Sequence, residues 1–475
     1  MPKIVFIEPQ APNLHIFSSF PLPRLGILIL GTMLKARGWE VEVFVEDLRR
    51  IDFEAVASAD LVGLSTITST APRAYALADK IRGMGIPVLM GGPHVTFLPE
   101  EALEHSDFII RGEGERALEA FIDAWEGNRN FDSVPNLSRL KDGRVVHNPM
   151  LPPAKDLDAI PHTDFTLLKP DRPARRFTPP IPVQTSRGCP FDCSFCSVTG
   201  MFGKKYRFRS TDHIIRELRL YNHRRNNIFF YDDNFAANRE RTKELLQAMI
   251  RERFKFQWTT QVRADIARDL ELVRLMKKAG CHTLYIGFES VNPGSLDAMK
   301  KKQTVEDMSR AVKVLHRHRI RIHGMFVLGF DEDDWQSVKK TLKFAVKTRL
   351  ATTQFLILTP LPGSELYRKM TSENRIQFSD WALYDAHHVV FRPARFSLFD
   401  LQKAQIFCHK KFYSLKQTAA RILAWQWLSV AVAHYARKLN RLWKKKNRTY
   451  LKVVDLLRPR KGTQITVDYR ELPNL

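Results

Sequence analysis

The chain carries three of its five cysteines in one stretch, Arg187-Gly188-Cys189-Pro-Phe-Asp-Cys193-Ser-Phe-Cys196. Thiolates hold iron–sulfur clusters, and a four-iron cluster that only carries electrons usually has four of them. The C-x3-C-x2-C spacing, with no fourth cysteine nearby, therefore predicts a cluster that has one iron open to another ligand. Zinc is the alternative, but zinc takes four ligands, commonly as two separated pairs.

The rest of the composition limits the class of protein. The other cysteines, Cys281 and Cys408, lie far from the loop and are expected to be buried thiols without a role. So few cysteines exclude a disulfide framework, and an oxygen-sensitive cluster favours a reducing, cytoplasmic setting. The first apolar stretch is too short for a signal peptide. A length of 475 residues predicts two or three domains.

Residues 1–140 show alternating strand and helix patterns, which predict a parallel, doubly wound sheet. Ligands of such sheets bind at the carboxyl ends of the strands. This places three loops along one edge, at residues 65–69, 91–96 and 111–115. Their paired glycines let a backbone approach a flat macrocycle or a phosphate closely, although most such glycines only make turns. The candidate cofactor-binding residues of these loops are Ser65, Thr66, Gly91, Gly92, Pro93, His94 and Glu113.

A proline-rich segment, residues 141–180, is predicted to be a linker over the surface. Residues 181–375 follow as a second domain, in which six predicted strands alternate with helical patterns. Functional side chains are expected at the carboxyl ends of those strands. The predicted strands are residues 183–186, 228–231, 256–261, 283–288, 320–328 and 355–358.

Polar side chains follow several of these strands. Asp232 and Asp233 come directly after the apolar run Ile-Phe-Phe-Tyr, where a carboxylate could accept charge-assisted hydrogen bonds from an ammonium group. Gln261 ends the third strand, and Glu289 with Ser290 ends the fourth. Phe195, just before the last cysteine of the loop, offers an aromatic face to a flat ligand. This domain therefore adds four further candidate site residues, namely Gln261, Glu289, Ser290 and Phe195.

The cysteine loop followed by six strand–helix units resembles the radical S-adenosylmethionine (SAM) enzymes. The loops GLSTIT, GGPHVTFLPEE and RGEGE resemble the cobalamin-binding domain that precedes many of them. The resemblance implies an α/β protein with a Rossmann-like cobalamin-binding domain, a partial (β/α)6 radical SAM barrel, and a mainly helical C-terminal region, residues 376–475. Residues 381–393 resemble the same stretch of class B methyltransferases such as the hopanoid methylases.

The resemblance also implies the chemistry. Cys189, Cys193 and Cys196 would hold a [4Fe-4S] cluster whose open iron binds SAM, and an external reductant such as flavodoxin or ferredoxin would supply the electron that cleaves it. Phe195 would pack on adenine, and the acidic and polar strand ends would contact the methionyl or ribose groups. One departure is that no Asp-x-His-x-x-Gly loop occurs. His15 and His94 are expected to be structural or surface residues, so cobalt would lack a histidine ligand.

The C-terminal region is basic. The net charge is +24, and from Lys410 to Lys461 there are fifteen basic residues and one acidic residue. Tryptophans beside basic residues suit an interfacial helix on anionic lipid; the alternative is a helix packed on the barrel with a solvated tail. No recognisable nucleic-acid module is present, so no nucleic-acid partner is expected. Of His387 and His388, at least one is expected to be exposed.

These observations predict a cobalamin-dependent radical SAM methyltransferase that acts on an unactivated carbon of a small molecule. The basic, tryptophan-bearing tail favours a lipid and a peripheral contact with a membrane. Two alternatives stay open. The same cofactors could serve cyclisation, oxidation or rearrangement, or the chain could be a non-catalytic cobalamin or redox sensor.

Overall fold

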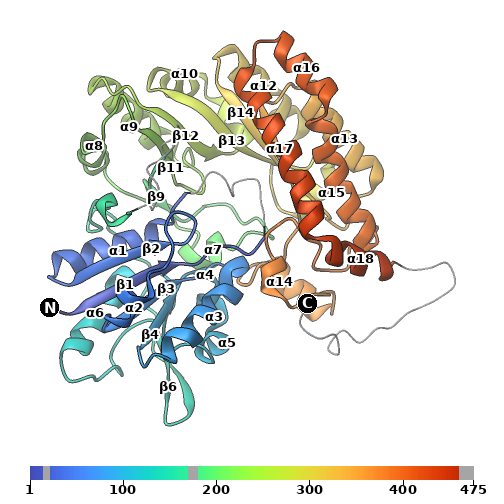
Figure 1. The fold of residues 1–475 in the computed structure, drawn as a ribbon. Coiled ribbons are helices and arrows are strands. Elements are labelled where there is room, and N and C mark those ends of the chain that lie inside the picture. The colour runs from blue at the N-terminus through green and yellow to red at the C-terminus, as the bar shows by residue number, and fades with distance from the viewer. Residues whose placement is uncertain (14–21, 170–179, 459–475) are drawn as a thin grey trace. The chain divides into compact units, whose positions relative to one another are not determined.

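A computed structural model of the protein describes residues 1–13, 22–169 and 180–458, and Figure 1 shows its helices and strands. The chain divides into two compact units. Of the described residues, the first unit contains 1–12, 22–169, 180–190 and 197–258, and the second contains 13, 191–196 and 259–458. None of the helices in the described ranges is long and apolar enough to cross a bilayer.

The first sheet has the strand order β2-β1-β3-β4-β5-β6-β7. Strands β1 to β5 are parallel, and their order winds outward in both directions from β1 and β3. The predicted doubly wound sheet is therefore confirmed, with its switch point between β1 and β3. The parallel strands are β1 (Lys3–Glu8), β2 (Glu40–Val45), β3 (Leu61–Ser65), β4 (Val88–Gly91) and β5 (Phe108–Ile110).

The sheet continues into the segment predicted to be a linker. Strand β6 (Leu137–Lys141) pairs antiparallel with β5, and β7 (Arg144–His147) pairs antiparallel with β6. Asp142 and Gly143 join β6 and β7, with φ of 51° and 75°. Asp-Gly is a strong signal for a two-residue hairpin because both positions need positive φ. Residues 144–147 are thus part of the sheet and were wrongly assigned to the linker.

Helices cover both faces of this sheet (Figure 1). Helices α1 (Leu25–Ala36) and α6 (Glu115–Glu126) share an apolar core with β1 and β2. Helix α3 (Ala71–Arg82) packs against β3 and β4 on the other face. For α1 and α3 this division follows from the right-handed crossover of parallel strands, since the two winding directions send their helices to opposite faces. The rule does not apply to α6, which leads into the antiparallel strand β6. The first unit also contains three short helices, α2 (Phe53–Ala57), α4 (Pro93–Phe97) and α5 (Pro99–Leu103).

The second large sheet has the order β15-β14-β13-β12-β11-β8, so its six strands lie in chain order. Strand β11 pairs parallel with β8, and β14 pairs parallel with both β13 and β15, as a partial barrel requires. The predicted partial barrel is confirmed. Its strands are β8 (Ile181–Val183), β11 (Asn227–Phe230), β12 (Gln257–Val262), β13 (Cys281–Glu289), β14 (Arg321–Leu328) and β15 (Thr352–Ile357).

The first barrel strand is shorter than predicted. Strand β8 ends at Val183, and Ser186 begins a separate strand, β9 (Ser186–Arg187), which pairs antiparallel with β10 (Arg207–Phe208). The break has a physical cause, because the backbone N–H groups of Thr185 and Ser186 donate to the carboxylate of Asp232 and not to a neighbouring strand.

Most of the helices that alternate with the barrel strands begin at polar caps. Asn238, Asp269, Thr304, Asp334 and Ser364 each accept a hydrogen bond from a backbone N–H of the first turn, which satisfies donors that a helix leaves open. Helices α7 and α11 begin without such a side-chain cap. The helices that accompany the barrel strands are α7 (Val198–Phe202), α8 (Thr211–Arg219), α9 (Arg239–Arg251), α10 (Leu270–Lys278), α11 (Pro293–Ala298), α12 (Val305–Arg317), α13 (Trp335–Lys347) and α14 (Glu365–Ser372).

The C-terminal region is helical, as predicted, and consists of α15 (Leu398–Phe412), α16 (Leu415–Leu423), α17 (Trp427–Lys446) and α18 (Arg448–Leu456). Cys408 is fully buried inside α15, as Cys281 is in β13. The expectation that His387 or His388 is exposed is wrong, since both are buried.

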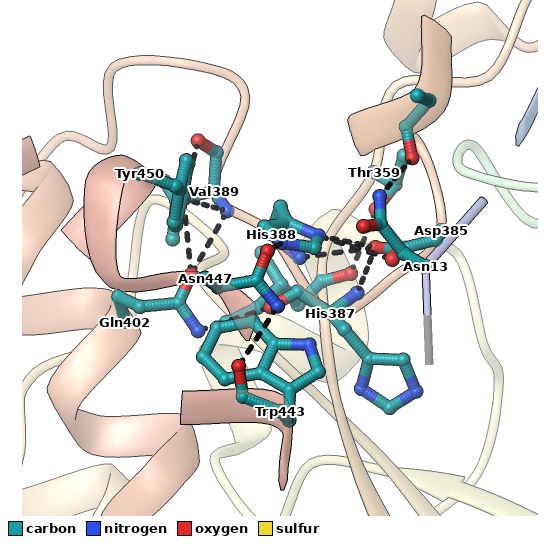
Figure 2. Close-up of polar contacts among 12 residues, drawn as sticks. Asn13, Thr359, Asp385, His387, His388, Val389, Gln402, Trp443, Asn447 and Tyr450 are labelled. Atoms are coloured by element: carbon teal, nitrogen blue, oxygen red, sulfur yellow. Dashed lines mark hydrogen bonds and ion pairs between the residues drawn. The ribbon is translucent and has the colours of Figure 1, made fainter. Parts of the chain in front are cut away.

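His388 lies at the centre of a buried polar network (Figure 2). Its Nδ1 is 2.9 Å from Asp385 Oδ1, and its Nε2 is 2.9 Å from Asn447 Oδ1. The amide of Asn447 is oriented by its Nδ2, which donates to the carbonyl of Trp443. Both ring nitrogens of His388 therefore lie within hydrogen-bonding distance of oxygen atoms. Burial alone would raise the pKa of Asp385, but His388 reverses the effect and lowers it.

Replacing His388 should destabilise the second unit. His388→Ala leaves the Asp385 carboxylate buried without its side-chain partner, which costs about 3 kcal/mol in comparable buried pairs. The effect should be strongest on α18, which begins next to Asn447, and hydrogen exchange of the α18 amides in the full-length chain measures it.

The matched control is His105→Ala, because His105 also lies 2.9 Å from a carboxylate, that of Asp79, but is partly exposed. This exposed pair should change the free energy of unfolding by less than about 1 kcal/mol. Unchanged exchange of α18 in His388→Ala would contradict the prediction.

Candidate functional site

Three loops at the carboxyl ends of β3, β4 and β5 are joined by hydrogen bonds, as the sequence predicts. The backbone N and Oγ1 of Thr66 donate to the carbonyl of Gly91 at 2.9 and 2.8 Å. Thr96 Oγ1 accepts from the N–H of Gly112 at 3.0 Å and donates to the carbonyl of Gly92. Side-chain hydroxyls thus hold the three loops along one edge of the sheet.

Gly92 is required by this arrangement. Its φ is 106°, and a Cβ atom there would meet the carbonyl oxygen of Thr66 at 2.4 Å. Gly92 therefore brings the loops after β3 and β4 together. Gly91 has no such constraint, because the nearest atom to its Cβ position is 3.7 Å away. Gly92 therefore serves to pack the loops together. The sequence alone does not show this role, because glycine is common at strand ends.

His94 is completely buried. Its Nε2 lies 3.1 Å from the hydroxyl of Tyr75 and 3.4 Å from Glu101. The ring therefore packs inside the first unit, in agreement with the expectation of a structural histidine. His15, the other candidate by position, lies outside the described residues.

The edge of the sheet fits a flat ligand. Ser65, Gly91 and Pro93 are partly exposed there, so backbone and small side chains face outward at the strand ends, where doubly wound sheets bind their ligands. With His94 buried, the described residues of these loops offer backbone and hydroxyl groups to cobalamin, and not an imidazole ligand to cobalt.

Sequence analysis missed two residues at the switch point. Arg24 donates to the carbonyl of Ser65 at 3.0 Å, and its backbone N–H donates to Glu8 at 2.8 Å. Glu8 ends β1 and is buried, which raises the pKa of its carboxyl despite the nearby Arg24 guanidinium. Arg24 thus connects the ends of β1 and β3. The apolar pattern of β1 gave no reason to single out its last residue.

Glu113, predicted to bind cofactor, is engaged in an ion pair. Its carboxylate accepts from the guanidinium of Arg207. Glu115 likewise pairs with Arg187 at 2.5 Å. Burial would raise the pKa of Glu115, but Arg187 outweighs it and the pKa is lowered. Both acidic residues of the RGEGE loop therefore attach the start of α6 to strands β9 and β10, within the first unit.

The cysteine loop is held at several points. In the first unit, Gly188 has a φ of 84°, and a Cβ there would meet the carbonyl of Lys205 at 2.5 Å, so only glycine fits before Cys189. In the second unit, Ser194 donates its N–H to the carbonyl of Met299 at 3.3 Å. The carbonyl of Ser194 accepts from Leu366 at 2.9 Å, which fixes the backbone between Cys193 and Cys196.

The thiols fit an iron–sulfur cluster with three protein ligands. Cys189, Cys193 and Cys196 are partly exposed, and none of them forms a disulfide bond within the described residues. Burial raises the pKa of Cys281 and raises that of Cys408 to about 12, which disfavours the thiolate that binds metal. In the described ranges no three His, Cys, Asp or Glu side chains converge as a single metal ion requires. A cluster is different, because each thiolate binds its own iron.

Asp232 and Asp233 have different surroundings. Asp232 is buried and accepts four hydrogen bonds, from the N–H and hydroxyl groups of Thr185 and Ser186, at 2.6–2.9 Å. A carboxylate offers about four acceptor positions, so those of Asp232 are filled. Solvent reaches the Asp233 side chain, yet many protein atoms surround it. This desolvation, together with the charge of Asp232, raises the pKa of Asp233 to about 7.

Glu289 ends β13 in a buried ion pair. Its Oε1 lies 2.7 Å from Lys301 Nζ, and both side chains are less than a tenth exposed. Gly287 makes room for this pair, since a Cβ there would meet Glu289 Oε1 at 2.3 Å. Glu289 itself has a φ of 60°. The sequence singled out Glu289 but contained no signal for Lys301, which lies in a loop after α11.

The remaining predicted residues lie in the second unit. Gln261 is partly exposed on β12, and Ser290 is buried, with its Oγ accepting from the N–H of Asn292 at 3.0 Å. The ring of Phe195 meets that of Phe330 edge to face at 6.1 Å. Arg263 places its guanidinium 3.9 Å from the ring centre of Phe191, inside the cysteine loop.

Gly92→Ala should destabilise the first unit by about 2–4 kcal/mol, because alanine meets both a disfavoured backbone conformation and the Thr66 carbonyl. Gly91→Ala, one residue earlier, should have little effect. Thermal unfolding of the two full-length variants, with hydrogen exchange in β3 and β4, measures the difference. Equal stability of the two variants would show that the loops do not depend on this close contact.

Comparison with known proteins identifies the two domains. The B12 binding domain model matches residues 18–122, and the Radical SAM superfamily model matches residues 183–345. Among solved structures, the cobalamin-dependent S-adenosylmethionine radical enzyme OxsB with aqua-cobalamin bound is similar in fold. The TM-score is 0.70 at 15% identity, over 94% of this chain and 75% of that one.

Two relatives match nearly the whole chain. An uncharacterized methyltransferase of Pyrococcus horikoshii is 31% identical over 82% of this chain and 88% of its own length. The bacteriochlorophyllide d C-12(1)-methyltransferase of Chlorobaculum tepidum is 30% identical over 92% of this chain and 94% of its own length.

More distant relatives differ in their reactions. One is the hopanoid C-3 methylase of Methylococcus capsulatus, which is 24% identical over 86% of this chain and 80% of its own length. Another is the anaerobic magnesium-protoporphyrin IX monomethyl ester cyclase of Rubrivivax gelatinosus, which is 26% identical over 87% of this chain and 78% of its own length. Similarity over most of the chain, together with the two domain matches and the three-cysteine loop, leads to one conclusion. The chain belongs to the cobalamin-dependent radical SAM methyltransferase family, whose cofactors are a [4Fe-4S] cluster, SAM and cobalamin.

Proposed function

We propose that this enzyme transfers a methyl group to an unactivated carbon of a small apolar molecule that contains a ring system. The observation that carries the proposal is the similarity to two methyltransferases at 30–31% identity over more than four fifths of the chain. This similarity extends beyond the residues that the two domain models match, 18–122 and 183–345.

The chain's own residues have separate tasks in this proposal. Cys189, Cys193 and Cys196 hold the cluster, and Asp233 accepts hydrogen bonds from the methionyl ammonium of SAM. Asp232 fixes the strand end from which the cysteine loop begins. When bound, the cofactors supply a radical that removes a hydrogen atom and a methyl group that replaces it. An electron carrier of the flavodoxin or ferredoxin class is the proposed reductant.

The substrate class is inferred from relatives and from the C-terminal region. The related enzymes named above act on a bacteriochlorophyllide and on hopanoids. The C-terminal region of this chain is basic and exposes tryptophans, which suits an apolar or lipid-like substrate. The cyclase relative supports a second candidate, ring formation with the same cofactors. Cyclisation would leave the substrate without an added carbon.

The products of SAM distinguish these functions. Methyl transfer consumes two SAM molecules, so wild-type protein reconstituted with iron, sulfide and hydroxocobalamin should release S-adenosylhomocysteine and 5'-deoxyadenosine together when supplied with a reductant and an accepted substrate. Mass spectrometry of a panel of chlorins and polycyclic lipids should show one product heavier by a CH2 group. Cys193→Ala should form neither nucleoside, because the cluster loses a ligand.

Cys408→Ala is the matched control, since Cys408 is a buried thiol outside the loop, and it should retain both products. Release of 5'-deoxyadenosine without S-adenosylhomocysteine would favour cyclisation over methylation. Absence of both nucleosides in the wild type, with cobalamin bound, would favour a sensor.

Binding of SAM should strengthen as the pH rises toward neutrality. The pKa of Asp233 is raised to about 7, so below that pH its carboxyl is protonated and binds an ammonium poorly. Between pH 6 and pH 7.5, where an α-amino group remains mostly cationic, the affinity should rise roughly tenfold. Calorimetry of the reconstituted protein measures this change, and Asp233→Asn should remove the pH dependence. A pH-independent affinity in the wild type would exclude this role for Asp233.

A further inference from the structure

The turn between α16 and α17, here called the α16–α17 corner, exposes a continuous apolar surface. Figure 1 shows these helices in the red part of the chain. Leu423 is 82% exposed, Trp425 78% and Trp427 57%, and Ile422 and Leu428 are also exposed. Single exposed apolar side chains are normal, but five within seven residues form a patch of the kind that marks an interaction surface.

The inner side of the corner is well packed. Arg421, buried at the end of α16, places its guanidinium 4.5 Å from the ring centre of Phe412. Arg437 of α17 donates to the hydroxyl of Thr418 at 2.6 Å and to the carbonyl of Tyr413 at 3.1 Å. These contacts fix the corner against α15 and α16. The apolar side chains therefore point outward from a defined framework.

Trp425 is explained neither by the backbone nor by the core. Its φ is 55°, in the left-handed region that glycine or asparagine usually occupies after a helix. A tryptophan in that conformation is strained, and one that is mostly exposed gains little from packing. Its nearest aromatic neighbour is Trp427, edge to face at 6.0 Å, which is itself exposed. A contact outside the chain would explain the residue.

The exposed face of α17 changes character along the helix. It begins with Trp427 and Leu428 and ends with the exposed residues Lys438, Arg441 and Lys444–Lys446. Within the described residues from Lys410 to Arg458, Asp455 is the only acidic side chain. An apolar tip followed by a basic face is complementary to a surface that has an apolar interior and negatively charged groups above it.

We propose that the α16–α17 corner inserts into the interface of an anionic phospholipid bilayer, with the basic end of α17 against the phosphate groups. Tryptophan favours the membrane interface because its ring is apolar and its N–H can bond to water. Lysine and arginine are attracted by anionic headgroups. Ser429, Ala433 and Trp443 of α17 are buried, so the corner and one face of the helix contact lipid, and the helix as a whole does not. The proposal does not depend on methyl transfer.

Vesicle flotation with the full-length chain tests the proposal. Wild-type protein should float with vesicles of phosphatidylcholine and phosphatidylglycerol and much less with phosphatidylcholine alone. Trp425→Gly should lower the bound fraction about tenfold because it removes most of an interfacial tryptophan's buried area, while its thermal stability stays equal or rises, since glycine suits the backbone. Leu220→Ser, which removes another largely exposed apolar side chain, should bind as the wild type does.

The charge component has its own matched pair. Replacing Lys444, Lys445 and Lys446 with glutamine should weaken binding to anionic vesicles, whereas replacing Lys339, Lys340 and Lys343 of α13, also exposed, should not. Equal flotation of Trp425→Gly and wild type, or equal binding to both kinds of vesicle, would overturn the proposal. Self-association in sedimentation experiments that Trp425→Gly abolishes, without vesicle binding, would assign the corner to a second copy of the chain.

Discussion

The Asp232 carboxylate fixes the start of the cysteine loop. It takes both backbone N–H groups of Thr185 and Ser186 and so ends the first barrel strand. Arg241 closes the arrangement from α9, donating to the hydroxyl and the carbonyl of Thr185. A buried carboxylate is stable only if its charge is balanced and its acceptor positions are filled. Burial raises the pKa of Asp232, and Arg241 and the hydrogen bonds offset part of this effect. The same hydrogen bonds direct the chain through Arg187 and Gly188 into the first cysteine.

The fold could be predicted from the sequence because its signals are local. The strands and helices predicted to alternate in residues 1–140 are present, since a short apolar run between polar residues marks a buried strand. The prediction of the first barrel strand was wrong because the strand is interrupted at Thr185. The cause is a hydrogen bond to Asp232, which lies 47 residues away in the sequence. The second error came from a turn, Asp142-Gly143, whose chemistry was in the sequence and was overlooked within a proline-rich segment.

The candidate site was predictable in its chemistry but not in the tasks of individual residues. The three cysteines are adjacent in sequence, so their spacing is visible. The partner of Glu113 is 94 residues away and that of His388 is 59 residues away. No local sequence pattern could show that Glu113 pairs with an arginine or that His388 is buried. Asp232 and Asp233 are neighbours of the same type, and only burial separates them.

The Glu289–Lys301 pair has a consequence for how this sequence can change over time. The backbone of Glu289 favours glycine, whereas the ammonium of Lys301 requires a carboxylate, and Gly287 must stay small to admit both. A change at any one of the three positions leaves the other two unsatisfied. Single substitutions at this strand end should therefore be selected against, and the three residues should be conserved together in related sequences.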